Sequence, residues 1–101
     1  MSYNGYENYE TWLVSLWLDN EYSTYNYWLE RARELLEEND MDVDQGRHEL
    51  SQSIKHDHVE NNPVAEVSVY SDLMGAALSA VNWDEVAKSF IQTAMEELED
   101  E

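Results

Sequence analysis

Residues 22–38 read YSTYNYWLERARELLEE, which is the most regular stretch of the chain. Apolar residues recur in it at intervals of three or four, at Tyr25, Trp28, Leu29, Ala32, Leu35 and Leu36. This spacing puts them on one side of an α-helix, which turns once in about 3.6 residues. The carboxylates that lie off this stripe are Glu30, Glu34, Glu37 and Glu38. The stretch therefore predicts a helix with an apolar inner face and an acidic outer face.

The segment before this helix predicts another helix, beginning at about Tyr9. It is apolar on most sides, through Trp12, Leu13, Val14, Leu16, Trp17 and Leu18. A short helix of this kind is expected in the middle of a core. Asn8 is expected to cap its first turn, because an Asn side chain accepts a hydrogen bond from a free backbone N–H there. Residues 1–8 are expected to form a polar arm.

The residues after 38 predict a turn over 39–46 and a third helix over about 45–60. This helix has only a thin apolar stripe, formed by Leu50, Ile54 and Val59. A helix with so little apolar surface is expected at the periphery of the fold.

Asn61, Asn62 and Pro63 form a clear break. The amphipathic stripe that follows predicts a fourth helix and consists of Val67, Tyr70, Leu73, Met74, Ala77, Leu78 and Val81. The alternation of Ala65, Val67 and Val69 leaves a short strand open as an alternative start. Asn82 is expected to cap a fifth helix with Glu85 in the third position. The stripe of that helix is Trp83, Val86, Ala87, Phe90, Ile91, Ala94, Met95 and Leu98.

Together these segments predict an all-α fold, a compact bundle of four or five helices. The first and fifth helices are expected to supply most of its aromatic core. We expect one domain over residues 1–101, because no linker is long enough to divide the chain. Residues 96–101 are expected to be a frayed acidic tail.

Charge is the most unusual property of the composition. There are 23 Asp and Glu against 5 Lys and Arg, which gives a formal net charge of −18. Phosphate backbones and anionic membrane surfaces repel such a chain, since binding to either needs Lys and Arg. We therefore expect neither nucleic acid nor membrane as a direct partner, and a basic protein instead. Salt should stabilise the fold by relieving self-repulsion.

The chain has no cysteine, which is typical of proteins in a reducing cytoplasm. Its first residues lack the basic and apolar regions of a secretory signal, and its longest apolar run is far shorter than a membrane span. The expected location is the cytoplasm of the host cell.

Three kinds of catalytic or metal site are disfavoured by spacing. Asp40, Asp42 and Asp44 alternate as in a calcium loop, but the sixth position is Gln45 and the twelfth is Ser51. The stretch is better interpreted as a solvated acidic turn. The histidines, at 48, 56 and 58, lack the spacing of a zinc site. No nucleophile motif is present. We expect no catalytic residue, no metal, no cofactor and no enzymatic activity.

Aromatic residues are frequent in the sequence and fall into two groups. The tryptophans lie on helical apolar stripes and are expected in the core: Trp12, Trp17, Trp28 and Trp83. Four tyrosines beside carboxylates are less clearly core residues and are typical of a protein-binding surface: Tyr3, Tyr6, Tyr22 and Tyr27.

The segment from Asn8 to Glu21 reads NYETWLVSLWLDNE. It resembles the N-Y-E-T-W-x-V-x-L-W-L-x-N-E signature of small uncharacterised proteins encoded by phages, plasmids and their hosts. This resemblance implies an origin in a mobile element and assigns no activity. In size, helicity and charge density the chain also resembles the acidic DNA mimics that phages use against restriction enzymes and CRISPR complexes.

The resemblance to DNA mimics has a physical basis. Duplex DNA carries one negative charge per roughly 1.7 Å of axis, and carboxylates three or four residues apart on a helix follow one another every roughly 5 to 6 Å. The expected partner-binding residues are Glu30, Glu34, Glu37, Glu38, Asp40, Asp42 and Asp44. Like charges at this spacing disfavour the helix, so something other than folding is expected to keep them.

The leading hypothesis is a phage or mobile-element anti-defence protein. It would occupy the DNA-binding groove of a basic host defence protein, either a restriction enzyme or a CRISPR effector. The alternative is an acidic adaptor that regulates a host protein at a site that does not bind DNA. The sequence leaves the oligomeric state open, with a homodimer among the alternatives.

Overall fold

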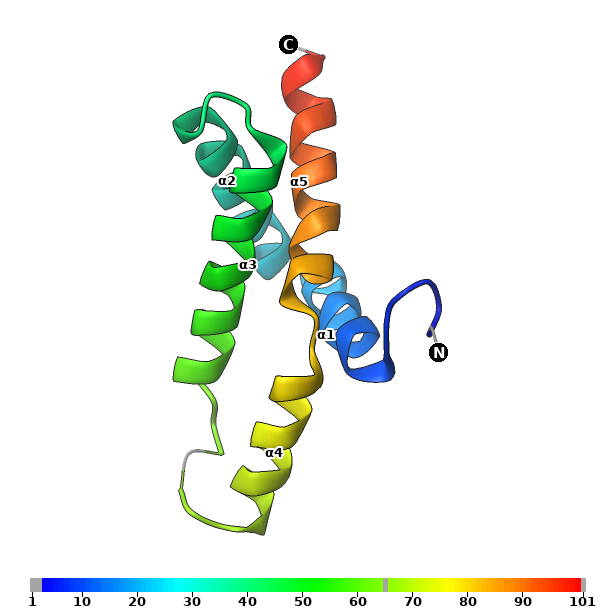
Figure 1. Ribbon diagram of the computed structural model, residues 1–101, viewed down its shortest axis with the longest axis vertical. Coiled ribbons are helices and arrows are strands. Elements are labelled where there is room, and N and C mark those ends of the chain that lie inside the picture. Colours follow the sequence, from blue (N-terminus) through cyan, green and yellow to red (C-terminus); the bar gives the residue numbers. More distant parts are fainter. Residues whose placement is uncertain (1–2, 65, 101) are drawn as a thin grey trace.

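Five α-helices and no β-strand form in the residues that the computed structural model describes, 3–64 and 66–100 (Figure 1). The helices are α1 (Tyr9–Asn20), α2 (Tyr22–Glu38), α3 (Val43–Glu60), α4 (Val69–Ala80) and α5 (Trp83–Glu99). The predicted all-α bundle is confirmed. None of these described helices combines the length and the apolar character required to span a bilayer.

Helices α2, α3 and α5 pack side by side and enclose the core, while α1 packs across α2 and α5 (Figure 1). The molecule is elongated, with extents of 49 × 28 × 24 Å. Its most deeply buried large side chains are apolar residues of these three helices, chiefly Leu36, Leu50, Ile54, Val86 and Ile91. Helix α4 lies at the end of the molecule that is farthest from the C-terminus (Figure 1).

The position of α3 corrects the sequence-based expectation of a peripheral helix. Leu50 and Ile54 are fully buried, and α3 packs against both α2 and α5. Gly46 is buried in the same contact although it has no side chain. A Cβ there would lie 3.3 Å from Leu36 Cδ2 and 3.5 Å from Ile91 Cδ1. Without a Cβ at this position, the backbone of α3 can approach the side chains of both α2 and α5 closely.

Helix α1 is the opposite case, because it was expected in the middle of the core and lies on its outside. The residues it buries are Thr11, Ser15 and Leu18, which recur at helical spacing. Trp17 points away from the core and is 67% exposed. The buried aromatic side chains come instead from α2 and α5, as Trp28, Trp83 and Phe90. A helix that is apolar on all sides gives no signal of which side faces inward.

Polar contacts fasten the start of α1 to the junction between α4 and α5. Asn8 caps α1 as expected: its Oδ1 accepts from the Thr11 N–H at 2.9 Å. The Asn8 side-chain amide also donates to the Ala80 carbonyl at 2.7 Å, and the Asn82 N–H donates to Thr11 Oγ1 at 2.9 Å. Asn8 and Thr11 of the N-Y-E-T-W stretch therefore hold the start of α1 against the last two helices.

The last two helices begin at side-chain caps, with Ser68 capping α4 and Asn82 capping α5. Asn82 Oδ1 accepts from the Glu85 N–H as expected, while the Glu85 carboxylate accepts from the Glu7 N–H at 2.8 Å and so secures the N-terminal arm. Helix α4 begins without a strand at Val67 or Val69; Ala65 lies outside the described residues. Helix α5 continues through Glu99, so residues 96–99 are helical and not frayed.

Candidate functional site

The four predicted glutamates of α2 all lie on its outer face. Trp28, Leu29, Ala32, Leu35 and Leu36 form the buried side of this helix. Glu30, Glu34, Glu37 and Glu38 are all exposed, as a 3.6-residue period requires. The sequence thus predicted the exposed position of these four glutamates correctly.

The turn between α2 and α3 adds three exposed carboxylates, Asp40, Asp42 and Asp44. Asp42 Oδ1 accepts from the Gln45 N–H at 3.1 Å and caps α3. Asp40 and Met41 have φ of 53° and 65°, in the left-handed region that Gly or Asn usually occupies at the end of a helix. This backbone conformation is costly for Met and, to a smaller extent, for Asp.

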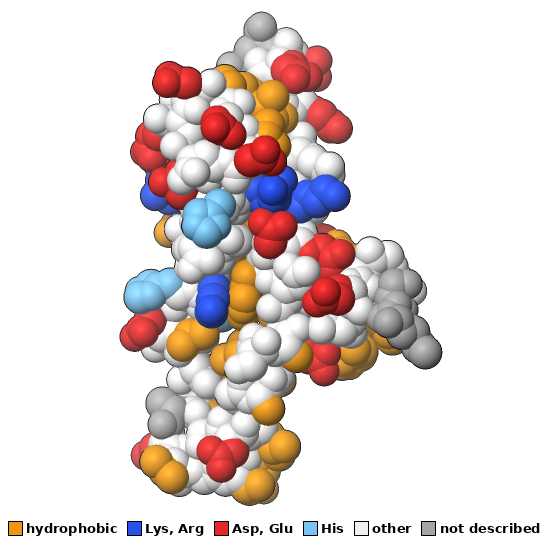
Figure 2. Space-filling model, viewed as in Figure 1, with side chains coloured by type: hydrophobic (Ala, Val, Ile, Leu, Met, Phe, Trp, Pro, Cys, Tyr) orange, Lys and Arg blue, Asp and Glu red, His pale blue; other side chains and the backbone are white. Residues whose placement is uncertain are grey.

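The end of α5 brings four further carboxylates to the same end of the molecule: Glu96, Glu97, Glu99 and Asp100. Arg33 on α2 pairs with Glu97, so the C-terminal halves of the two helices lie beside each other. We call these four residues and the seven predicted ones the acidic end. Figure 2 shows acidic side chains gathered at this end. The sequence shows that residues 96–100 are acidic. Only the packing of α5 against α2 shows that these carboxylates lie at the same end of the molecule as the turn after α2.

The carboxylates of the acidic end differ in their partners. Arg31 lies 3.4 Å from Glu34 and 3.9 Å from Glu38, and Arg47 lies 3.2 Å from Asp44. Arg47 also pairs with Asp84 of α5 at 2.9 Å, and these carboxylates raise its pKa through a hydrogen bond and Coulomb attraction. Within residues 3–64 and 66–100, six side chains of the acidic end make no hydrogen bond or ion pair: Glu30, Glu37, Asp40, Glu96, Glu99 and Asp100. These six are the carboxylates least explained by folding.

Helix polarity strengthens this distinction. Asp42 and Asp44 lie at the N-terminus of α3, where the helix dipole favours negative charge. Glu37, Glu38 and the α5 carboxylates lie at helix C-termini, where the dipole disfavours negative charge, and neither last turn contains a basic residue. Negative charge is therefore concentrated where the fold itself works against it.

Comparison with known proteins assigns the chain to a family. A family model described as a family of unknown function (DUF7249) matches residues 1–101. The chain belongs to this family. No curated protein and no solved structure matches it. The function of this DUF7249 protein is therefore argued from its own residues.

The other chemical candidates give no site in the described parts of this DUF7249 chain. Residues 3–64 and 66–100 contain no group of three or more His, Cys, Asp or Glu side chains placed to hold a metal ion. His48 and His56 are exposed. His58 is half-buried, with one ring nitrogen 2.8 Å from the Ile54 carbonyl and its ring centroid 5.3 Å from that of Trp83. Its surroundings match those of a packed histidine.

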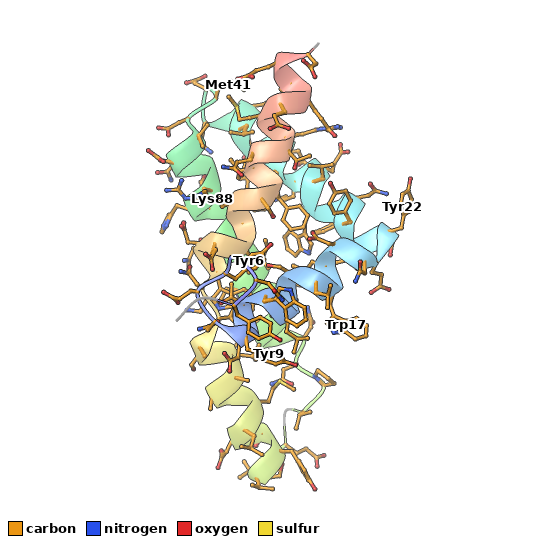
Figure 3. All side chains as sticks on the ribbon, turned by 90° about the vertical axis from the view of Figure 1, so that its right-hand side faces the viewer. Tyr6, Tyr9, Trp17, Tyr22, Met41 and Lys88 are labelled. Atoms are coloured by element: carbon orange, nitrogen blue, oxygen red, sulfur yellow. The ribbon has the colours of Figure 1, made fainter. Side chains whose placement is uncertain are left out.

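A second surface of this DUF7249 protein is aromatic. Tyr3 packs against Trp12 and Tyr9 at centroid distances of 4.9 and 5.3 Å, and Trp17 and Tyr22 project into solvent from α1 and the start of α2 (Figure 3). Tyr22 is 82% exposed. The core position predicted for Trp17 is therefore wrong, whereas Tyr3, Tyr22 and Tyr27 are exposed as expected and Tyr6 is half-buried. Asp19 lies between Trp17 and Tyr22 in sequence, and burial raises the pKa of its carboxyl.

Proposed function

We propose that the acidic end binds a basic, DNA-binding protein and takes the place of DNA in its groove. The carrying observation is the concentration of carboxylates at the C-termini of α2 and α5, where helix dipoles disfavour them. A surface retained against the preference of the fold indicates selection for a partner. Lys and Arg side chains that normally neutralise phosphates are the partner groups that fit it.

Charge density supports a mimic of DNA more than a generic acidic surface. The net charge of −18 over the 49 Å length amounts to roughly one charge per 2.7 Å, against one per roughly 1.7 Å in duplex DNA. Residues 67–83 contribute a single charge, Asp72, so the density at the acidic end exceeds this average. A small domain needs a net charge of only about 2 to 8 for solubility.

The proposed biological role is non-enzymatic inhibition of a restriction enzyme or CRISPR effector in the host cytoplasm. The resemblance of residues 8–21 to proteins of phages and plasmids supports a mobile-element origin, and defence systems are the DNA-binding proteins that such elements encounter. Blocking their DNA grooves requires charge and shape, without any catalytic group.

The aromatic surface supports one rival function. Exposed Trp and Tyr side chains are enriched at protein interfaces, where they bury large areas with little loss of conformational freedom. Trp17 and Tyr22 lie on α1 and at the start of α2, away from the turn over residues 39–42 that forms part of the acidic end. An adaptor that binds a host protein at a site unrelated to DNA would use this surface and would be insensitive to changes at the acidic end.

The test is affinity capture from a nuclease-treated bacterial lysate on three immobilised proteins. They are the wild type, a quadruple variant with Glu30, Glu34, Glu37 and Glu38 changed to Gln, and the variant Trp17→Ala. We expect the wild type and Trp17→Ala to retain the same DNA-binding protein and the quadruple variant to retain much less. Glu→Gln keeps the shape of each side chain and removes only its charge.

Salt provides the internal control of this capture. The Debye length falls from about 10 Å at 0.1 M to about 3 Å at 1 M, so the retained protein should be released as salt increases. Equal retention by the wild type and a folded quadruple variant would contradict the proposal. Loss of retention in Trp17→Ala alone would favour the adaptor.

A further inference from the structure

Helix α4 is the least supported element of the fold. None of its residues from Val69 to Ala80 is buried, and its main packing partner is α1. Helices of about 12 to 15 residues are marginal in water unless an apolar face is covered by tertiary packing. Met74 and Leu78 are half-buried on the inner side of this 12-residue helix, with Leu78 against the core, and the apolar residues of its other side are left exposed.

The exposed face of α4 has the pattern of a helix-packing seam. Val69, Leu73 and Ala76 are exposed and recur at intervals of four and three residues, which is the spacing of side chains that face a neighbouring helix. Val69 is 63% and Leu73 62% exposed, and Tyr70 beside them is 70% exposed. Figure 2 shows several apolar side chains at the lower end of the molecule. The small side chain of Ala76 leaves room for the close approach of another helix.

Charge identifies what can cover this face. Residues 67–83 contain Asp72 as their one charged side chain, and α4 lies at the opposite end of the molecule from the acidic end (Figure 1). A basic partner gains no attraction here. A second copy of the chain offers a surface that is equally apolar and nearly neutral. Pairing through α4 also puts the two acidic ends as far apart as this elongated shape allows.

We propose that two copies of the chain associate through α4 about a twofold axis. The patch that contains Val69, Leu73 and Ala76 on one copy packs on the same patch of the other, as in an isologous interface, with the two α4 helices antiparallel so that the acidic ends point away from each other. Tyr70 and Val67, which is fully exposed, widen the contact. This interface goes beyond the proposed function and does not depend on it, because its residues lie outside the acidic end.

The size of the seam sets the expected affinity. Helix α4 is about 18 Å long at about 1.5 Å per residue, so pairing along it buries less than the roughly 800 Å² per partner of a standard stable interface. The association is therefore expected to be weak and transient, with a dissociation constant of about micromolar or higher. This constant should fall several-fold from about 0.1 to about 1 M salt, because screening removes the repulsion between two highly charged copies.

The test is sedimentation equilibrium of the full chain from micromolar to submillimolar concentration. The wild type should form dimers, whereas Leu73→Glu should raise the dissociation constant by about tenfold or more, the expected effect at a central interface residue. Ala76→Glu should do the same. Trp17→Glu is the matched control, since Trp17 is equally exposed and apolar but lies on α1, and it should leave dimerisation unchanged.

Three outcomes would overturn the proposal. A wild type that stays monomeric at every concentration would show that a second copy does not cover α4. Dimers that persist in Leu73→Glu would place the interface elsewhere, and an equal effect of Trp17→Glu would indicate non-specific association. The chain has no cysteine, so single cysteines provide a second readout: Ala76→Cys should form a disulfide-linked dimer on oxidation and Asp44→Cys should not. Equal yields from both would also contradict an interface at α4.

Discussion

The two ends of the molecule are opposites in charge and in packing. The acidic end rests on α2, α3 and α5, whose shared core includes Leu36, Leu50 and Ile91, none of them more than 1% exposed. Helix α4 carries one charged side chain, Asp72, and has no fully buried residue. The comparison teaches that charge and stability are coupled here, because only a well-packed three-helix core can support carboxylates at unfavourable helix ends. Helix α4 has little repulsion between carboxylates to offset, and in the monomer its outer apolar side chains are exposed to solvent.

The largest expected difference between the two ends is in core packing. Ile54→Ala should lower the free energy of unfolding by about 2–5 kcal/mol, because it leaves a cavity in a fully packed site. Leu73→Ala should change it by less than about 0.5 kcal/mol when both are measured by urea unfolding of the monomer. A comparable loss in both variants would show that α4 is packed as tightly as the core.

Removing charge from the acidic end should stabilise the free protein. The quadruple Gln variant of α2 loses like-charge repulsion between Glu30 and Glu34 and between Glu34 and Glu38, and loses two carboxylates from the helix C-terminus. We expect a gain of about 1 kcal/mol, reduced by the loss of the pairs with Arg31. The gain should shrink in 1 M salt, and thermal unfolding at both salt concentrations checks it. A destabilised variant would mean that these carboxylates contribute to folding.

Relieving backbone strain in the turn between α2 and α3 should also stabilise the fold, by less than the removal of charge does. Met41→Gly should stabilise the fold by about 0.5–1 kcal/mol, because Gly adopts a positive φ without the steric cost that Met meets. All charges of the acidic end are kept, so partner binding should not change. A destabilised variant would show that the Met41 side chain, 38% exposed, packs more usefully than its exposure indicates.

The smallest expected effect concerns Asp19, between the two exposed aromatic residues. Its pKa is raised above 3.8 by burial, so the folded state binds this proton more tightly than the unfolded state does. Stability from this residue is therefore present at low pH and is lost as the pH rises through the raised pKa. Asp19→Asn should weaken the pH dependence of unfolding above pH 3.8 by at most a few tenths of a kcal/mol, since the group is only partly buried and solvent screens it. An unchanged pH profile would contradict this assignment.

Sequence periodicity predicted the helices better than their arrangement. The apolar stripe of α2 fixed both its inner side and the outer position of its glutamates, and the caps at Asn8 and Asn82 were local signals. The central position of α3 was missed because its apolar stripe is thin and because Gly46 contacts two other helices only after folding. The orientation of α1 was missed because a helix that is apolar on all sides has no preferred inner face.

For the candidate site too, the sequence predicted local features and missed those that depend on tertiary packing. Carboxylates on one helix follow from spacing, and all seven predicted residues are exposed. The contribution of α5 depends on its packing against α2 and α3, which brings Glu97 to Arg33, 64 positions away in the chain. Helix polarity, which separates carboxylates that assist folding from those that oppose it, becomes usable only once the helix ends are known.

Competition with duplex DNA tests the central claim most directly. The protein captured on the wild-type chain is purified, and its affinity for the chain is titrated at fixed salt with increasing concentrations of a duplex oligonucleotide. If the acidic end takes the place of DNA, the apparent dissociation constant should rise in proportion to the DNA concentration, without levelling off. An apparent affinity that stays constant while the partner is saturated with DNA would show that both bind at once, and would contradict the account.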